Sequence, residues 1–366
     1  MKKRLLIPIL LLCTTLLGAQ AVREATPSIS TRSATDANGR TVVLEAPVTD
    51  LLIAGKAAVM PANALFLFPE VDDMHLSLAK TDQGLGDFFS LIKPELDQQA
   101  RLSQTASVEE IAARGADLVL MKATHYESTA KKLDQLGVKN FTMSLETWPE
   151  WQAEIVQLGA LLGNPERAEE ILSLYQTRID LIAGRSAQVS ATDQKRVLLL
   201  QADRTDNTTS YKIAPDGWMQ TWMVEASGAI PVWKGANKAA AGWSTVSFEQ
   251  IAAWDPDLVV LISYSSPSAS YLDGVYSSPL WADLRVVKES AVVASPHDLM
   301  NYIQPVASWV LGLEWLAKTT YPELYADIDM RGEVERFYRE FYSISDPTVI
   351  TTLTDAYSRS VADNRR

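Results

Sequence analysis

Aromatic side chains gather in the segments that follow the predicted strands of this chain. Loops beyond the carboxyl ends of parallel strands are where α/β proteins hold their ligands. The candidates for ligand contact in these loops are Tyr126, Trp148, Trp218, Trp243, Tyr264 and Tyr302, together with His125 and His297. Aromatic faces bind flat, partly apolar ligands and attract cations. A macrocycle or a catecholate chelate therefore suits these loops better than a naked ion.

The three histidines offer a second chemistry, which is direct ligation of a metal. They are His75, His125 and His297, and imidazole nitrogen is a good ligand for zinc, nickel and iron. Their separations along the chain are not those of a local metal motif, so only folding could bring them together. A single histidine more often satisfies an ordinary hydrogen bond, and a free divalent metal is therefore the alternative to a chelate.

The charge of the ligand stays open. The loops contain no arginine cluster of the kind that binds an anionic siderophore. The cations available to the loops are Lys56, Lys122, Arg204, Lys212, Lys234 and Lys238. The chain also lacks a G-x-S-x-G elbow, an H-E-x-x-H pair and a P-loop. We therefore expect a binding protein without a cofactor of its own, and an exported two-lobed enzyme is the more distant alternative.

A repeated phrase shows which elements position these loops. SVEEIAARGADLVLM at 107–121 and SFEQIAAWDPDLVVL at 247–261 share eight of fifteen positions. Each copy begins with a serine followed three residues later by Glu110 or Gln250, which is the spacing of a helix capping box. Each then passes through a turn into an apolar run that suits a buried parallel strand. Two such units predict two similar α/β lobes with parallel sheets and a ligand cleft between them.

The segment between the two copies predicts one long helix. Asn164-Pro165 marks its start, and apolar residues keep helical spacing as far as Ile182. A single rigid helix between the lobes predicts modest closure of the cleft. Further predictions are a hairpin with its turn at Asn38-Gly39 and two amphipathic C-terminal helices interrupted at Tyr321-Pro322.

The N-terminus has the features of a secretory signal. Three cations precede an apolar run that ends in small residues around Gln20, and the run is too short for a membrane span. Cys13 lies inside this run after Leu12, which favours a signal over a lipid anchor, although lipidation stays an alternative. Removal of residues 1–21 would change the formal charge from −12 to −12 − 3 = −15 and leave no cysteine. The charge argues against a nucleic-acid partner.

These features divide the chain into six predicted parts. They are a signal peptide (1–21), a flexible leader (22–38), an N-terminal α/β lobe (39–163), a linker helix (164–190), a C-terminal α/β lobe (191–345) and a polar, disordered tail (346–366).

The order of these motifs resembles a known family. An exported leader, the hairpin TDANGRTVVLEAP, the unit ending in DLVLM, a long helix after LGALLGNPERAEEIL and the stretch GWSTVSFEQIAAWDPDLVVL follow one another over residues 36–345. This order is similar to the helical-linker (class III) periplasmic substrate-binding proteins of ABC importers for iron-siderophore, haem and vitamin B12. The resemblance implies a monomeric, periplasmic carrier that passes a small metal chelate to a membrane permease.

The resemblance also implies docking residues. In that family a glutamate on the outer face of each lobe contacts arginines of the permease. WSTVSFEQI assigns this role to Glu249 in the second lobe, and KATHYES assigns it to Glu127 in the first, with Glu109, the repeat counterpart of Glu249, as its competitor. The order of expected ligands is an iron chelate (siderophore or haem), then cobalamin, then a free divalent metal such as zinc, nickel or manganese.

Overall fold

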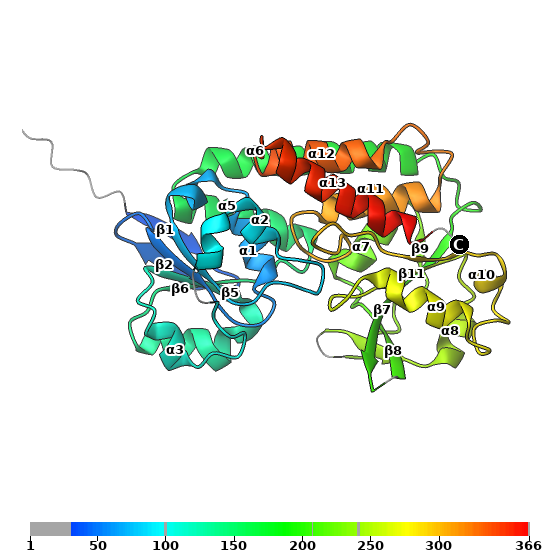
Figure 1. Cartoon of the computed structure of the whole chain (residues 1–366), viewed down its shortest axis with the longest axis horizontal. Helices are drawn as coiled ribbons and strands as arrows, with labels where there is room; N and C mark the ends of the chain where they lie inside the picture. The colour runs from blue at the N-terminus through cyan, green and yellow to red at the C-terminus, as the bar shows by residue number, and fades with distance from the viewer. Residues whose placement is uncertain (1–30, 99–100, 207, 240–241, 365–366) are drawn as a thin grey trace, which may run out of the picture.

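The chain folds into two lobes that lie side by side, bridged along one edge by the long helix α6 (Pro165–Ser186) (Figure 1). The computed structural model describes residues 31–98, 101–206, 208–239 and 242–364. Each lobe is built on a sheet with helices packed against it. The two-lobed α/β architecture with a single linker helix is therefore confirmed.

The N-terminal lobe contains a parallel sheet of four strands. Their order across the sheet is β4 (His75–Leu78), β3 (Asp50–Ile53), β5 (Leu118–Lys122) and β6 (Asn140–Met143). Leu52 lies opposite Ser77 on one side and Val119 on the other. All five residues of β5 are buried, as expected for a strand covered on both faces.

Short helices and a separate hairpin complete this lobe. The helical elements are α1 (Val59–Leu65), η1 (Pro69–Asp73), α2 (Phe88–Ile92), η2 (Pro94–Gln98), α3 (Val108–Ala112), η3 (Ala123–His125), η4 (Tyr126–Ala130), α4 (Lys131–Gln135) and α5 (Trp148–Leu162). The hairpin pairs β1 (Arg32–Thr35) with β2 (Thr41–Leu44) through a turn with Gly39 at φ +75°. The flexible leader predicted for 22–38 is thus wrong from Arg32 onward, because these residues form an antiparallel ladder and Arg32 donates to Leu162 O.

The sheet of the C-terminal lobe is mixed rather than wholly parallel. Its order is β10 (Ser244–Val246), β8 (Thr208–Ile213), β7 (Arg196–Thr205), β11 (Leu258–Ile262) and β12 (Val292–Ala294), with β9 (Ile230–Pro231) also paired to β7. β7, β9, β11 and β12 are parallel. Only two residues separate β7 from β8, which is too short for a parallel crossover, so β8 runs antiparallel.

Helices surround this second sheet and form a layer beside the linker. Around the sheet lie α7 (Met219–Ala226), α8 (Phe248–Trp254), η5 (Ser268–Tyr271), α9 (Leu272–Tyr276) and α10 (Arg285–Lys288); the further helices are α11 (Trp309–Thr320), α12 (Met330–Phe341) and α13 (Pro347–Ala362). The break between α11 and α12 follows the prediction at Tyr321-Pro322. The disordered tail predicted for 346–366 is wrong, because Asp346 caps α13 and Leu353 and Tyr357 bury one face of that helix.

The two copies of the repeated phrase adopt equivalent structures. Ser107 caps α3 with a complete capping box, in which the Ser107 hydroxyl accepts from the Glu110 amide and the Glu110 carboxylate accepts from the Ser107 amide. Ser247 caps α8 by accepting from the Gln250 amide. Each helix is followed by a central strand of its lobe, β5 or β11.

The linker helix is attached to the C-terminal lobe through buried polar contacts. Arg178 of α6 donates to both carboxylate oxygens of Glu314 in α11, at 3.1 and 3.0 Å, and both side chains are almost completely buried. Tyr175 of α6 donates to Ala307 O at 2.7 Å. These bonds hold α6 against the lobe that follows it.

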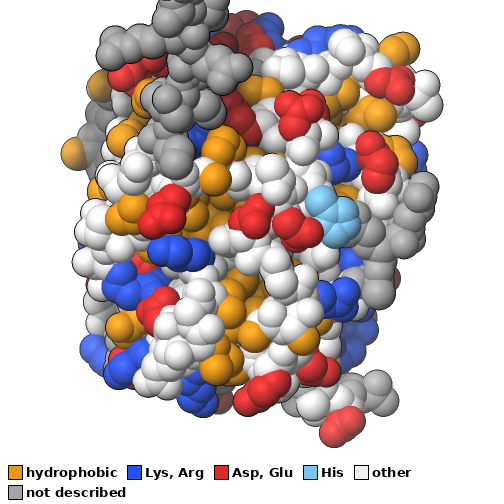
Figure 2. Space-filling view, turned by 90° about the vertical axis from the view of Figure 1, so that its left-hand side faces the viewer, with side chains coloured by type: hydrophobic (Ala, Val, Ile, Leu, Met, Phe, Trp, Pro, Cys, Tyr) orange, Lys and Arg blue, Asp and Glu red, His pale blue; other side chains and the backbone are white. Residues whose placement is uncertain are grey.

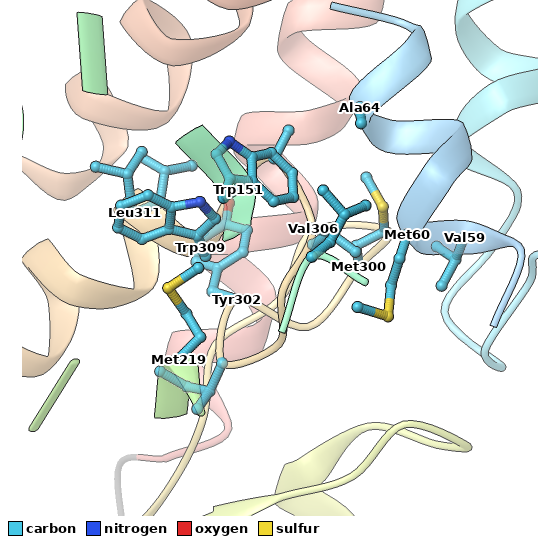
Figure 3. Close-up of a cluster of buried hydrophobic side chains, with 14 of the residues drawn as sticks. Val59, Met60, Ala64, Trp151, Met219, Met300, Tyr302, Val306, Trp309 and Leu311 are labelled. Atoms are coloured by element: carbon cyan, nitrogen blue, oxygen red, sulfur yellow. The ribbon is translucent and has the colours of Figure 1, made fainter. Parts of the chain in front are cut away.

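An apolar cluster joins the lobes behind the cleft. Figure 3 shows Met60 of α1 beside Met300 and Val306, which belong to the C-terminal lobe. Asn63 of α1 also donates to the sulfur of Met300 at 2.9 Å. The two lobes therefore share part of one core.

The charge on the outer surface and the length of the helices complete the description of the fold. At the outer end of the N-terminal lobe, acidic and basic side chains are interspersed rather than gathered by sign (Figure 2). Within the residues that the structure describes, no helix is both long and apolar enough to cross a bilayer. The predicted signal peptide (1–21), Cys13 and most of the leader lie outside the described residues.

Candidate functional site

A cavity of about 590 Å³ opens between the two lobes. The N-terminal lobe lines it with Ala57, Val59, Met60, Lys80, Thr81, Asp82, Gln83, Gly84, Gln104 and Glu146, and the C-terminal lobe with Trp218, Gln220, Trp243, Tyr264, Ser265, Gln304 and Pro305. This volume is within the range of about 300–1,000 Å³ that is usual for small-molecule sites.

The lining follows from the topology of the parallel strands. Ala57 comes just after β3, Lys80 after β4, Glu146 after β6 and Tyr264 after β11. Parallel strands bring their carboxyl ends to one edge of a sheet, so the first three segments meet at that edge of the N-terminal sheet, and Tyr264 follows a parallel strand of the C-terminal sheet. The cavity therefore occupies the place where the sequence predicts a ligand.

Three aromatic rings form one wall of the cavity. The Trp218 and Trp243 rings are 5.9 Å apart and inclined by 82°, and the Trp243 and Tyr264 rings are 6.0 Å apart and inclined by 61°. All three side chains are half-buried. Steeply inclined neighbouring rings make a concave apolar surface that can hold a flat ligand or a cation.

A buried glutamine lies beside this wall. Gln220, in the first turn of α7, is 1% exposed. Its Nε2 donates to the Tyr264 hydroxyl at 3.2 Å, and that hydroxyl donates to Ile303 O at 2.6 Å. Burial raises the pKa of Tyr264, so the phenol stays protonated.

A carboxylate and an ammonium group of the N-terminal lobe form an ion pair at the cavity. Lys122 Nζ donates to Glu146 Oε1 at 2.8 Å and also to Ser144 O. Burial raises the pKa of Glu146, and the Lys122 charge opposes this shift. The Met219 amide donates to the backbone carbonyl of Glu146 at 2.7 Å, a bond between the lobes. Glu146 therefore lies next to the start of α7.

A pair of glutamines bridges the cleft. Gln83 and Gln304 exchange two amide hydrogen bonds, of 3.1 and 3.0 Å, from opposite lobes. The Gln83 loop is ordered by Asp82, whose Oδ1 accepts from the amides of Gly84, Leu85 and Gly86. Gly84 has φ +79°, and a Cβ there would lie 2.7 Å from Ser265 O. Glycine thus permits the lobes to approach closely at this point.

The structure brings three of the eight predicted ligand contacts to the cavity. These three are Trp218, Trp243 and Tyr264. The other five, His125, Tyr126, Trp148, His297 and Tyr302, do not line it.

Each of these five side chains has partners elsewhere in the described residues. The His125 ring packs on Gly55 and donates to Lys56 O at 3.2 Å, and the Tyr126 ring lies under the Arg40 guanidinium at 5.1 Å. The remaining three lie in the packing between and within lobes: Trp148 stacks on Trp222, His297 donates to Asp298 O at 2.8 Å, and the buried Tyr302 donates to Asp298 Oδ2 at 3.0 Å.

The described residues contain no group of three or more His, Cys, Asp or Glu side chains placed to hold a metal ion. His75 lies on β4 and donates to Asp50 Oδ2 at 2.8 Å, while His125 and His297 have the carbonyl partners given above. The shared three-histidine site is therefore not formed in this structure.

The two repeat glutamates occupy matching positions. Glu109 and Glu249 are exposed in the first turns of α3 and α8, two residues after the capping serines. Both helices lie along the lower edge of the molecule in Figure 1, opposite α6 and α12. The pKa of Glu249 is lowered mainly by a hydrogen bond from its own backbone amide, and to a smaller extent by one from the Ser247 side chain. Glu127 instead forms an ion pair with Lys131 at 3.2 Å.

Comparison with known proteins gives the family. Residues 64–299, well over half of the chain, match the periplasmic binding proteins. The chain belongs to this family. It is a periplasmic binding protein with a helical linker, and proteins of this family are extracytoplasmic and typically not enzymes.

The individual relatives share only a small part of their sequence with this chain. The molybdate-binding protein MolA of Haemophilus influenzae is 26% identical over 293 residues, which cover 73% of this chain and 79% of MolA. The structure of MolA bound to molybdate has a TM-score of 0.70 at 20% identity and covers 86% of this chain and 99% of that one. Helicobacter pylori CeuE with Ni(II) bound has a TM-score of 0.68 at 18% identity, with coverages of 88% and 99%. These structures show the shared fold.

Several cavity residues carry no signal in the sequence. Gln83, Gln104, Gln220 and Gln304 are amides in ordinary polar contexts, and Glu146 is one acidic residue among many. The position of Glu146 shortly after the strand that follows Gly137 is the one feature that could have drawn attention to it.

Proposed function

We propose that this periplasmic binding protein captures a bulky metal chelate, in the first place an iron chelate such as a siderophore complex or haem, and carries it to an ABC permease. The observation that carries the proposal is the concave wall of Trp218, Trp243 and Tyr264 on a cavity of about 590 Å³. Cobalamin, which is larger and also partly apolar, is the alternative chelate.

MolA raises a second candidate, a molybdate-type oxyanion. Such an ion is small beside this cavity and is bound best by converging cations and N–H donors. The part of the lining that the structure describes contains Lys80 but no arginine, and it also contains Asp82 and Glu146. These side chains favour the chelate over the oxyanion.

CeuE with nickel raises a third candidate, a free divalent metal. The described residues contain no suitable group of ligands. His297→Ala should therefore leave the protein's metal affinity unchanged when no chelator is present. A clear loss of metal binding in that variant would favour the metal candidate.

Delivery requires contacts with the permease, and we assign them to Glu109 and Glu249. Their equivalent positions on α3 and α8 place one carboxylate on each lobe, along the same edge of the molecule. Glu127 is the other candidate in the first lobe, but its carboxylate already pairs with Lys131.

Charge reversal tests this assignment. Glu109→Lys and Glu249→Lys should abolish chelate uptake by whole cells while leaving the affinity of the purified protein for the chelate unchanged. Glu335→Lys is the matched control, because Glu335 is an exposed carboxylate on α12, at the opposite edge. Glu127→Lys separates the two candidates in the first lobe. Normal uptake with Glu109→Lys and loss with Glu127→Lys would reverse the assignment.

A further inference from the structure

We propose that the cavity selects a chelate that carries an ammonium group, held by Gln220 Oε1 and the Glu146 carboxylate beside the aromatic wall, and that it rejects oxyanions. This inference rests on the proposed carrier function and specifies the chemical class of the ligand.

The hydrogen bonds around Gln220 fix which end of its amide is free. The Tyr264 hydroxyl donates its proton to Ile303 O, so it can only accept from Gln220. Nε2 of Gln220 must therefore point at Tyr264, and Oε1 must point away from it. Oε1 is buried and has no hydrogen-bond partner among the described residues. A ligand that fills this place must donate a hydrogen bond, because a carbonyl oxygen can only accept one.

Glu146 adds a negatively charged acceptor close by. The Met219 amide, one residue before Gln220, bonds to Glu146 O. The charge of Glu146 also raises the pKa of Tyr264, although burial and the Gln220 hydrogen bond are larger influences. Lys122 donates to Glu146 Oε1 at 2.8 Å, and its charge opposes the rise that burial causes in the pKa of the Glu146 carboxyl. An ionised carboxylate that lines a cavity accepts hydrogen bonds and attracts a cation.

The aromatic wall favours the same charge. The three inclined rings of Trp218, Trp243 and Tyr264 lie on the same lobe as Gln220. Ring faces attract ammonium groups, most strongly where water is partly excluded. From the opposite lobe, Thr81 contributes a hydroxyl that is buried and also unpartnered among the described residues. Each lobe thus has one buried, unpartnered polar atom among the described residues that line the cavity.

An oxyanion would meet unsuitable groups in this cavity. Its oxygens would face Gln220 Oε1 and the Glu146 carboxylate, which cannot donate. Among the described residues, the one cation that lines the cavity is the exposed Lys80, and Asp82 lies close to it in sequence. Like-charge contacts and buried unpaired acceptors both disfavour such a ligand.

A matched pair of probes tests the inference. The first is the ferric complex of a linear trihydroxamate with a free terminal amine, and the second is the same complex with that amine acetylated. A ferric tris-catecholate and molybdate serve as anionic probes. Tryptophan fluorescence titration of the full mature chain should show about tenfold tighter binding of the ammonium-bearing complex than of its acetylated form.

Variants then assign the preference to the named residues. Gln220→Met removes the free acceptor, and the double variant Lys122→Met/Glu146→Gln removes the carboxylate charge without leaving an unpaired buried ammonium. Both should reduce the tenfold preference to near unity. Gln176→Met, an exposed change on α6, is the matched control. The melting temperature of each variant shows whether it is folded, and the Gln220→Met result stands alone if the double variant does not fold.

Each result decides between the proposals. Equal binding of the amine and acetylated complexes, or tightest binding of the tris-catecholate, overturns the ammonium inference and leaves the chelate carrier intact. Tightest binding of molybdate overturns both. Failure of all four probes to bind overturns the ammonium inference, and titration with haem and cobalamin then decides whether the chelate carrier falls with it.

Discussion

The buried ion pair on the linker helix gives a quantitative prediction. Arg178 is the guanidinium partner of Glu314, whose side chain is 2% exposed. Arg178→Met leaves that carboxylate buried without a counter-charge, which should lower the free energy of unfolding by about 3–5 kcal/mol. Arg178→Met/Glu314→Met removes both charges, and Glu333 still pairs with Arg336 at 2.9 Å. The double variant should therefore recover most of the loss.

The loss should also depend on pH. Burial raises the pKa of Glu314 to about 7, although Arg178 opposes this shift. Because the folded state holds a proton that the unfolded chain releases, a raised carboxyl pKa lowers stability as the pH rises from the ordinary value of 4.5 toward the raised one. Without Arg178 the pKa rises further. The destabilisation by Arg178→Met should therefore be greatest near about pH 8 and smaller near about pH 5.5.

Urea unfolding followed by tryptophan fluorescence measures both effects. The wild-type chain and the two variants are compared at the two pH values. A loss below about 1 kcal/mol for Arg178→Met at the higher pH, or a double variant no more stable than the single one, would refute the reasoning.

Two further predictions concern the cavity wall and the segment beneath it. Trp243→Ala should weaken chelate binding by about tenfold or more, whereas Trp243→Phe should keep most of the affinity. Fluorescence or calorimetric titration measures both affinities. An unchanged affinity in Trp243→Ala would exclude this ring from the site. Glu154 accepts from the Ser144 and Leu145 amides, and burial raises its pKa to about 7. Its contribution of up to about 3 kcal/mol should therefore fall as the pH rises between about 4.5 and 7, and Glu154→Gln should flatten that part of the stability profile; an equally steep profile in the variant would contradict this.

The architecture was predictable because its signals are local. The capping patterns at Ser107 and Ser247 indicate where two helices begin, and the apolar runs after them have the length and composition of central strands. Asn164-Pro165 marks the start of the linker in the same way. Such signals depend on residues that are neighbours in the sequence, so they can be recognised without knowledge of the fold.

Two errors arose where polar composition concealed structure. The segment after Ser345 is rich in Thr, Asp and Ser, yet Asp346 and Pro347 form a helix start, and Ile350, Leu353 and Tyr357 share one buried face. Residues 32–35 form a strand only because β2 pairs with them. The signal for the C-terminal helix was present in the sequence, but the polar composition of the segment outweighed it in the prediction. The strand at residues 32–35 has no such local signal, because it depends on pairing with β2.

The site was predictable only in part. Trp218, Trp243 and Tyr264 lie at the cavity because strand ends bring their loops there. Tyr302 follows the last strand in the same way, but Asp298 binds its hydroxyl in the core. The role of Gln220 depends on Tyr264 and Ile303, which are distant in sequence. Contacts of this kind are set by tertiary packing and leave no local pattern.

The most direct test of the carrier function is native mass spectrometry of the protein purified from its own periplasm, combined with a visible absorption spectrum. A retained coloured mass that contains both metal and an organic chelator is the predicted result. A bare metal adduct, or a retained oxyanion, would contradict the chelate assignment. An empty protein that haem, cobalamin and ferric chelates all fail to shift would contradict it as well, and would return attention to an exported enzyme.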